Sequence, residues 1–309
     1  MKHLFIVNPV AGGKKARGAD VEREIRGVAG ELGEPYEIYV TQGHMDACRK
    51  VAEEAGSNEW LRVYSCGGDG TLNECVNGAA GRANAAVTHY PCGTGNDFIR
   101  MFGKADEDRF RDLRALIAGP VRALDLIDCN GRYSINICSV GIDARIGTDV
   151  HKYSGIPLIG GATGYVVSLV VNLIKGVTGR FRISTVEGAG EEAGEGEYTL
   201  ICACNGRFYG GGFNPVPDAR PDDGIIDFLI VNDVSRLKFV QVVGKYAKGR
   251  YRELGDIITH VRGGYMKIDS DCEVVVNVDG EAMRAKSVSM RIIPDGVNFI
   301  FPPEMGFFG

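Results

Sequence analysis

The sequence SCGGDGTLNE, residues 65–74, follows an apolar run and combines three glycines with an acid, a hydroxyl and an amide. Glycine lets the backbone approach a bound group closely and adopt turns that other residues resist. A helix that starts directly after such a loop adds unpaired N–H groups and a positive dipole end, which favour an anion. The stretch therefore favours a phosphate-binding loop between a strand and a helix, with a tight structural turn as the alternative.

Asp69 lies in the middle of this loop, where a carboxylate alone would repel a phosphate. A bridging cation removes that conflict, and Mg²⁺ binds carboxylate and phosphate oxygens together. The sequence contains neither G-x-x-x-x-G-K-[ST] nor a G-x-G-x-x-G that follows a predicted strand. The loop therefore differs from the P-loop and from the dinucleotide fingerprint, and it predicts a magnesium-assisted phosphate site of another kind.

Two more polar, glycine-containing loops follow predicted strands: NPVAGG at residues 8–13 and PCGTGNDF at residues 91–98. Around these loops, strand-like apolar runs alternate with helix-like segments. That alternation predicts a parallel sheet with helices on both faces, and ligands of such sheets bind beyond the carboxyl ends of the strands. We therefore expect all three loops at one edge of the sheet.

From about residue 123 the sequence changes to short β-rich runs, which predict a second, mostly antiparallel domain. A chain of 309 residues is long enough for two domains. We place an α/β nucleotide-binding domain at residues 1–123, with the tail 298–309 able to return to it, and a β-rich domain at residues 124–297. The acidic, glycine-rich segment 187–197 is interpreted as a solvated hairpin loop.

The formal net charge of −5 argues against general nucleic-acid binding, which requires a basic surface. Nine cysteines without a CxxC pair favour reduced thiols in a cytoplasmic protein, and the first residues do not resemble a signal peptide. Residues 153–174 carry no charge and are long enough to span a bilayer. Because Pro157 and the Gly160–Gly161 pair interrupt this run, we expect a buried or cleft-lining helix at residues 162–175.

The three loops together resemble the signatures of the diacylglycerol kinase catalytic family, which includes bacterial soluble lipid kinases and sphingosine and ceramide kinases. The GGDG loop also resembles that of NAD kinases. The resemblance continues in order through the second half of the chain: NICSVGIDA at 136–144, NGRFYGGGFNPVPDARPDDGIID at 205–227, VDGE at 278–281 and IIPDGVNFIFP at 292–302. It implies a nucleotide-binding domain followed by a lipid-substrate domain.

The resemblance assigns ATP to the loops. The residues that it implies for nucleotide binding are Asn8, Pro9, Gly12, Thr41, Gly67, Gly68, Asp69, Gly70, Thr71, Asn73, Thr94, Asn96 and Asp97. From sequence alone, Thr41 also fits a helix N-cap. The resemblance further implies a magnesium site away from the reaction, formed by the Asp223 side chain with the backbone carbonyls of Arg220 and Ile225. A plain Asp-Gly turn is the alternative for that stretch.

The resemblance makes Glu281 the proton acceptor. A lipid hydroxyl barely ionises at neutral pH, so its attack on phosphorus benefits from a positioned base. Without the resemblance, Asp279–Gly280 would be interpreted as a hairpin turn and Glu281 as a surface residue. Asp69 competes for the role of base. Its glycine-rich loop suits magnesium and phosphate positioning better, since phosphoryl transfer depends mostly on alignment and charge neutralisation.

These features predict an ATP-dependent lipid kinase. Diacylglycerol is the expected acceptor and phosphatidic acid the product, as in phospholipid biosynthesis. NAD kinase activity is an alternative that the additional loops at 8–13 and 91–98 disfavour. A catalytically silent nucleotide or lipid sensor is a second alternative, disfavoured because Asp69 and Glu281 are both present.

A soluble enzyme with a bilayer substrate needs a surface that contacts the membrane. Residues 235–254 predict an amphipathic helix with Lys245, Lys248, Arg250 and Arg252 near its end. Each basic residue near anionic lipid contributes about 1 kcal/mol to binding. We therefore expect a cytoplasmic protein that visits the inner face of the membrane reversibly, with a solvated helix face as the alternative. A homodimer is compatible with this picture.

Overall fold

The structure is a computed structural model, which describes residues 1–13, 15–31, 33–57, 59–142, 178–186 and 194–308. The chain divides into two compact units: Met1–Leu126 with Pro294–Gly309, and Ile127–Ile293. The boundaries expected from the sequence, at residues 123 and 298, lie near these divisions. By residue range, β5 (Val121–Cys129) and β13 (Glu281–Ile300) contribute to both units.

The first unit is built on a parallel sheet. Its strands are β1 (Lys2–Val7), β2 (Tyr36–Val40), β3 (Leu61–Gly67) and β4 (Ala85–Pro91), in the order β2-β1-β3-β4. The end of β13 adds a parallel strand beside β4, where Asn298 lies opposite Ala86. All residues of β3 are buried, as expected for a continuous apolar run in a parallel sheet that is covered on both faces.

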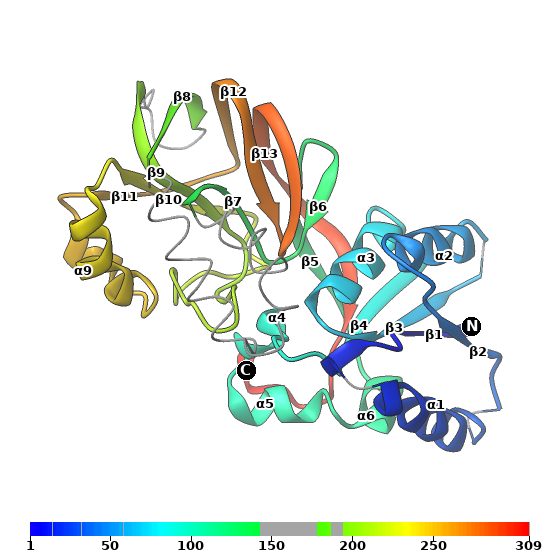
Figure 1. Ribbon diagram of the computed structural model, residues 1–309. Coiled ribbons are helices and arrows are strands. Elements are labelled where there is room, and N and C mark those ends of the chain that lie inside the picture. Colours follow the sequence, from blue (N-terminus) through cyan, green and yellow to red (C-terminus); the bar gives the residue numbers. More distant parts are fainter. Residues whose placement is uncertain (14, 32, 58, 143–177, 187–193, 309) are drawn as a thin grey trace. The chain divides into compact units, whose positions relative to one another are not determined.

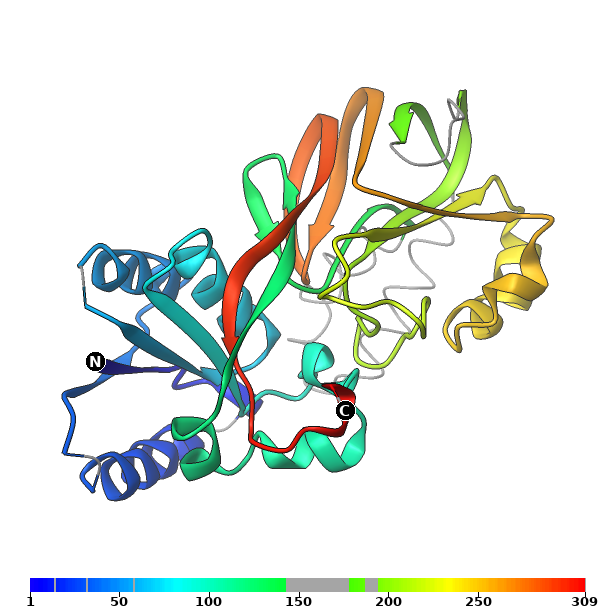
Figure 2. The ribbon, with the colours of Figure 1, turned by 180° about the vertical axis from the view of Figure 1, so that it is seen from behind.

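Helices cover both faces of this sheet. They are α1 (Lys15–Ala29), α2 (Asp46–Ala55), α3 (Asp69–Ala79), α4 (Asp97–Arg100), α5 (Lys104–Arg109) and α6 (Leu113–Ile117). α2 and α3 lie on one face, and α1 and α6 lie on the other (Figures 1 and 2). Ala47, Val51 and Ala55 of α2 are buried and share one helix face, which explains how this short helix docks.

The C-terminal tail completes the core of the first unit through aromatic contacts. The ring of Phe299 lies 5.4 Å from that of Phe98, between centroids, and Phe301 lies 5.5 Å from Phe102. Such edge-to-face pairs stabilise beyond the apolar area that they bury. Because Phe98 is the last residue of the third polar loop, the tail anchors that loop to the core.

The second unit is rich in antiparallel strands, which confirms the predicted β-rich, mostly antiparallel domain. Its further strands are β6 (Arg132–Ser134), β7 (Ile137–Gly141), β8 (Gly179–Val186), β9 (Glu195–Cys204), β10 (Ile226–Asn232), β11 (Ile258–Gly263) and β12 (Tyr265–Val278). The order is β11-β10-β9-β7-β12-β13, and β8 pairs with β9 and β12. Apolar side chains form a separate cluster on each face.

The predicted helix at residues 235–254 is shorter than expected. α9 spans Arg236–Tyr246, and a 3-10 turn follows at Tyr251–Leu254. Gly249 explains the break, since its φ of +69° lies in the left-handed region that ends helices. Three of the four basic residues of the predicted helix end, Lys248, Arg250 and Arg252, therefore lie beyond α9.

Some sequence predictions fall on parts of the chain that the structure does not describe. The uncharged run 153–174 and its predicted helix at 162–175 lie outside the described residues, as does most of the acidic loop 187–197. Among the residues that are described, no helix is both long enough and apolar enough to cross a membrane.

Candidate functional site

The first polar loop contacts the second at the carboxyl ends of β1 and β3. Asn8 follows β1, and its Nδ2 donates a hydrogen bond to Thr71 Oγ1 of α3 at 3.1 Å. Thr41 follows β2, and its backbone N–H donates to the carbonyl of Val7 at 3.0 Å. β1 is the neighbour of both β2 and β3. The ends of these three strands therefore bring Asn8, Thr41 and Thr71 to one edge of the sheet.

The second and third loops touch so closely that glycine is required. A Cβ atom on Gly93 would lie 2.5 Å from the Cα atom of Gly68, and a Cβ atom on Gly67 would collide with the Thr71 side chain. The backbone N–H groups of Cys92 and Gly93 both donate to the carbonyl of Gly67, at 2.8 and 2.9 Å. These glycines therefore allow the loops after β3 and β4 to pack backbone against backbone.

Two aspartates meet where these loops pack together. The Oδ1 atom of Asp69, the first residue of α3, accepts a hydrogen bond from the backbone N–H of Asp97 at 2.6 Å. Asp97 is the first residue of α4 and is buried, and its own Oδ1 lies 3.0 Å from Arg100 Nη1. A Cβ atom on Gly95 would reach to 2.5 Å from Asp69 Oδ2. The loops thus hold carboxylate oxygens, which suit Mg²⁺, beside a helix N-terminus, which suits phosphate.

His89 supports the third loop from within β4, a role that the sequence did not reveal. His89 is fully buried, and its Nε2 lies 3.1 Å from Asn96 Oδ1, which can only accept. Burial lowers the pKa of His89 to about 4, so the ring is neutral at pH 7. Asn96 has a left-handed φ of +52° and donates to the carbonyl of Gly93 at 2.9 Å. His89 therefore fixes the strained residue that shapes the loop.

Glu74, the last residue of the opening motif, orders the segment that follows Thr41. Its two carboxylate oxygens accept from the backbone N–H groups of Met45 and Ala47, at 2.9 and 3.0 Å. These donors lie at the start of α2, where N–H groups lack intrahelical acceptors. The motif on β3–α3 therefore also caps the neighbouring helix.

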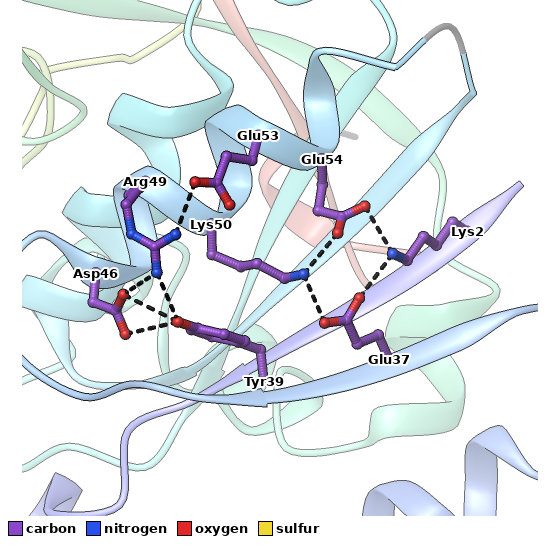
Figure 3. Close-up of polar contacts among 8 residues, drawn as sticks. All are labelled: Lys2, Glu37, Tyr39, Asp46, Arg49, Lys50, Glu53 and Glu54. Atoms are coloured by element: carbon purple, nitrogen blue, oxygen red, sulfur yellow. Dashed lines mark hydrogen bonds and ion pairs between the residues drawn. The ribbon is translucent and has the colours of Figure 1, made fainter.

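A polar network between β2 and α2 also holds the segment that follows Thr41 (Figure 3). Asp46 accepts from the Tyr39 hydroxyl at 3.0 Å, from Arg49 at 2.7 Å and from the Gln42 backbone N–H at 2.8 Å. The Gln42 bond and the Arg49 guanidinium hold the pKa of Asp46 below its usual range. Because Gln42 follows Thr41 directly, this network fixes the turn at the end of β2.

The remaining residues predicted to bind the nucleotide make fewer contacts with the three loops. Thr94 is exposed at the tip of the third loop. Gly12 has a left-handed φ of +69°, and Pro9 lies against Gly18 of α1. Gly70 belongs to the first turn of α3, whereas Asn73 is buried within that helix, with its Oδ1 3.3 Å from Asn77 Nδ2.

In the second unit, Glu281 is the first residue of β13, directly after the Asp279–Gly280 turn. Both turn residues have positive φ, +50° and +93°, so the predicted Asp-Gly hairpin turn is present. The Glu281 side chain is 33% exposed, and its Oε2 lies 4.0 Å from Nη2 of Arg132 on β6. The carboxylate is therefore open to solvent on one side and faces a cation on the other.

Asp223 follows the PVPDARP stretch and is held by protein groups. Its Oδ1 accepts from the Ile225 backbone N–H at 3.1 Å, and its Oδ2 lies 2.6 Å from Arg262 Nη2. Burial nevertheless raises the pKa of Asp223, so Arg262 does not fully offset the loss of water. An additional cation would favour the ionised carboxylate. Magnesium thus fits the charge of this site, although Arg262 competes for one oxygen.

The sequence matches two protein-family models. The diacylglycerol kinase catalytic domain matches residues 2–129, and the YegS C-terminal NAD kinase beta sandwich-like domain matches residues 136–301, more than half of the chain. The chain belongs to the diacylglycerol kinase-like lipid kinase family. The first model contains all three polar loops, and the second contains Asp223 and Glu281.

Relatives of this lipid kinase family member are found in Staphylococcus aureus. A protein of strain JH9 named "Putative lipid kinase" is 25% identical over 254 residues, which cover 82% of this chain and 81% of that protein. The proteins of the same name in strains N315 and MRSA252 show the same identity and coverage.

Solved structures share the fold of this family member. A protein of Bacillus anthracis str. Sterne described as a "putative diacylglycerol kinase" has a TM-score of 0.74 at 23% identity and covers 98% of this chain and 96% of its own. A second structure, of a diacylglycerol kinase from the same organism, has a TM-score of 0.70 at 24% identity, with 98% of each chain covered.

Proposed function

We propose that the protein is an ATP-dependent lipid kinase that transfers the γ-phosphate to a lipid hydroxyl, with diacylglycerol as acceptor and phosphatidic acid as product. The main support is the meeting of three polar loops at one sheet edge, in a chain whose residues 2–129 match the diacylglycerol kinase catalytic domain. The choice of diacylglycerol as acceptor rests on the match to the diacylglycerol kinase catalytic domain.

The first unit binds ATP in this proposal. Gly67, Gly68 and Gly93 have no side chain that would keep phosphate oxygens away from the loop backbone, and the N-terminus of α3 contributes its dipole. Asn8, Thr41 and Thr94 extend the same surface. Asp69 would hold Mg²⁺, which supplies positive charge to the β- and γ-phosphates when bound. The protein's task here is to align the phosphates and to orient the Asp69 carboxylate through the backbone N–H of Asp97.

Glu281 acts as general base in this proposal. Its carboxylate accepts the proton of the lipid hydroxyl while the hydroxyl oxygen forms a bond to the γ-phosphorus. The bond between that phosphorus and the oxygen bridging to the β-phosphate breaks, and ADP leaves with the electron pair. The partial exposure of Glu281 supports this role, since a base must be reachable by its substrate.

Asp223 is proposed to bind a second magnesium ion that supports the fold. The backbone carbonyls of Arg220 and Ile225 would complete its oxygen ligands, together with water. Binding requires that the metal displace Arg262 from one carboxylate oxygen, since that guanidinium lies 2.6 Å from Oδ2. The expected affinity at Asp223 is therefore lower than at the phosphate site.

The proposal places the enzyme in the cytoplasm, in reversible contact with the inner face of an anionic membrane. All nine cysteines are free thiols, which fits a reducing compartment. The basic residues predicted to contact lipid are largely ion-paired. Lys245 and Arg250 lie 3.3 and 2.6 Å from Glu253, and Arg252 lies 3.0 Å from Asp218. Their attraction to anionic lipid is correspondingly reduced.

The outer face of α9 offers a stronger contact. Leu237 and Val240 lie one turn apart and are 70% and 56% exposed. Arg236, next to Leu237, forms no ion pair with any residue in the described parts of the chain. Two apolar side chains beside an unpaired cation suit the boundary between lipid headgroups and acyl chains. We therefore assign the membrane contact to this face rather than to the basic residues after it.

The test of the function is a panel of acceptors incubated with γ-labelled ATP and magnesium. Diacylglycerol, monoacylglycerol, phosphatidylglycerol, sphingosine and NAD⁺ are compared, and the products are separated by thin-layer chromatography. We expect label in phosphatidic acid. Label in another lipid would correct the acceptor but keep the lipid kinase, whereas label in NADP⁺ alone, or no transfer despite ATP binding, would reject the proposal.

A further inference from the structure

The carboxylate of Asp279 is surrounded by hydrogen-bond donors from a distant segment. Its Oδ1 accepts from Ser134 Oγ at 2.5 Å, from the Asn136 N–H at 3.1 Å and from the Ile137 N–H at 2.9 Å. Its Oδ2 accepts from the Ile135 N–H at 2.9 Å. Three consecutive backbone N–H groups and a hydroxyl thus converge on one side chain, far more than a turn aspartate needs.

The same turn is fixed at two further points. The Asp279 backbone N–H donates to the carbonyl of Ile137 at 3.1 Å, and the Gly280 N–H donates to Asn277 Oδ1 at 2.8 Å. Asp279 itself holds a left-handed φ of +50°, which a non-glycine residue adopts only where its surroundings compensate. The carboxylate contacts provide that compensation, so they determine the direction in which β13 begins.

β13 begins with Glu281. Arg132, the cation that faces Glu281, lies just before the segment 134–137 that binds Asp279. Arg132 lies two residues before Ser134 on β6, and its Nη2 lies 4.0 Å from Glu281 Oε2. The Nε and Nη2 atoms of Arg132 are buried and make no hydrogen bond within the described residues. The cluster around Asp279 therefore joins the two short segments that carry Glu281 and its ion-pair partner.

We propose that Asp279 is a positioning residue for the reaction: by binding residues 134–137 it holds Glu281 in place beside Arg132. This inference rests on the proposed role of Glu281 as general base. Asp279 does not touch substrate in this account. It acts through Glu281, whose carboxylate must reach the lipid hydroxyl at hydrogen-bond distance, and a displacement of about 1 Å can lower turnover by roughly 10²-fold.

The test compares Asp279→Asn with Asp128→Asn in the full-length protein. Asp128 provides a matched control, since its Oδ1 accepts from the Gly131 N–H at 2.6 Å in another turn of the same unit. In Asp279→Asn, one of the two accepting oxygens is replaced by an NH₂ group, which would face a hydrogen-bond donor and repel it. We expect Asp279→Asn to lower kcat by about 10–10²-fold with KM for ATP within about twofold, and Asp128→Asn to change neither.

A double-mutant cycle separates positioning from general damage. If Asp279 acts through Glu281, Asp279→Asn should lower kcat in the wild-type background and have almost no further effect in Glu281→Gln. An equal loss in both backgrounds, or an unchanged kcat for Asp279→Asn, would overturn the inference. If Asp279→Asn does not fold, Ser134→Ala removes one of the four carboxylate contacts, and the same dependence on Glu281 is expected with a smaller loss.

The outcomes also distinguish this inference from the proposed function. A wild-type protein that binds ATP but labels no lipid would contradict the function itself, and full activity of Glu281→Gln would contradict the role of Glu281 as base. Loss of activity in Glu281→Gln together with normal activity in a folded Asp279→Asn would contradict only the positioning role.

Discussion

The Oδ1 atom of Asp69 lies 2.6 Å from the backbone nitrogen of Asp97, and this bond joins the first residues of two helices that follow neighbouring strands. The bond keeps the acid of the GGDG loop oriented at the sheet edge. An ionised acceptor makes such a bond shorter and stronger than a neutral one. The third loop therefore holds Asp69 in place at the sheet edge to which we assign the magnesium ion and the phosphates in the proposed function.

Asp69→Asn should impair both turnover and magnesium-dependent nucleotide binding. The amide can keep the bond to Asp97 through its oxygen, but it lacks the negative charge that a divalent cation requires. Calorimetric titration with ATP, in the presence and absence of Mg²⁺, measures the effect. We expect magnesium to strengthen ATP binding in the wild type and to have little effect in the variant. An unchanged magnesium dependence would remove Asp69 from the metal site.

Gly93→Ala should weaken ATP binding and lower the free energy of unfolding. The new methyl group would lie 2.5 Å from Gly68 Cα, so the two loops must separate. Overpacking of this kind costs about 1–3 kcal/mol. Gly27→Ala is the control, because nothing lies within 4 Å of the added atom and the site is inside α1. That change should stabilise by about 0.5–1 kcal/mol, and urea unfolding measures both variants.

Stability should fall as the pH drops from 7 toward 4, with a contribution from His89. The folded pKa is about 4 and the unfolded value is about 6.5. The unfolded chain therefore binds more protons in this window, and unfolding is favoured as the pH falls. At pH 5 the loss from this group is about 2 kcal/mol.

His89→Gln isolates that contribution. The amide nitrogen can still donate to Asn96 Oδ1, but it does not titrate. The difference in unfolding free energy between pH 7 and pH 5 should be smaller in the variant than in the wild type. Equal differences would show that His89 does not titrate as its burial implies.

Binding to anionic vesicles should depend on the outer face of α9. Sedimentation with phosphatidylcholine vesicles, with or without phosphatidylglycerol, compares the wild type with Leu237→Gln/Val240→Gln. We expect the double variant to lose most of its binding. A variant with Gln at positions 245, 248, 250 and 252 should lose less, because three of those cations already have carboxylate partners. A larger loss of binding in the variant at 245, 248, 250 and 252 would assign the membrane contact to those basic residues. A change of oligomeric state in Leu237→Gln/Val240→Gln would show that this face binds a second copy of the chain.

The sequence predicted the placement of the loops well, because strand ends follow from local patterns. The apolar runs before Asn8, Gly67 and Gly93 became neighbouring strands, and the glycines at 67, 68 and 93 lie where two backbones meet. The end of α9 was predicted less well. Gly249 interrupts the helix, and its effect depends on a φ that an amphipathic pattern does not reveal.

Residues that act over long sequence separations were missed for a physical reason. His89 looks like one more residue of a buried strand until its contact with Asn96 is known. Asp279 looks like an ordinary Asp-Gly turn residue, since its partners at 134–137 lie more than 140 positions away in the sequence. Each role comes from the packing of loops against strands, which no local pattern encodes.

The most direct measurement of the central claim is phosphoryl transfer from γ-labelled ATP to diacylglycerol by the wild type and by Glu281→Gln. The account predicts labelled phosphatidic acid with the wild type. Glu281→Gln should bind ATP almost normally but turn over about 10²–10⁴-fold more slowly, the usual loss for a general base. Full activity of Glu281→Gln would contradict the assignment of the base, and a wild type that binds ATP but labels no lipid would contradict the proposed function.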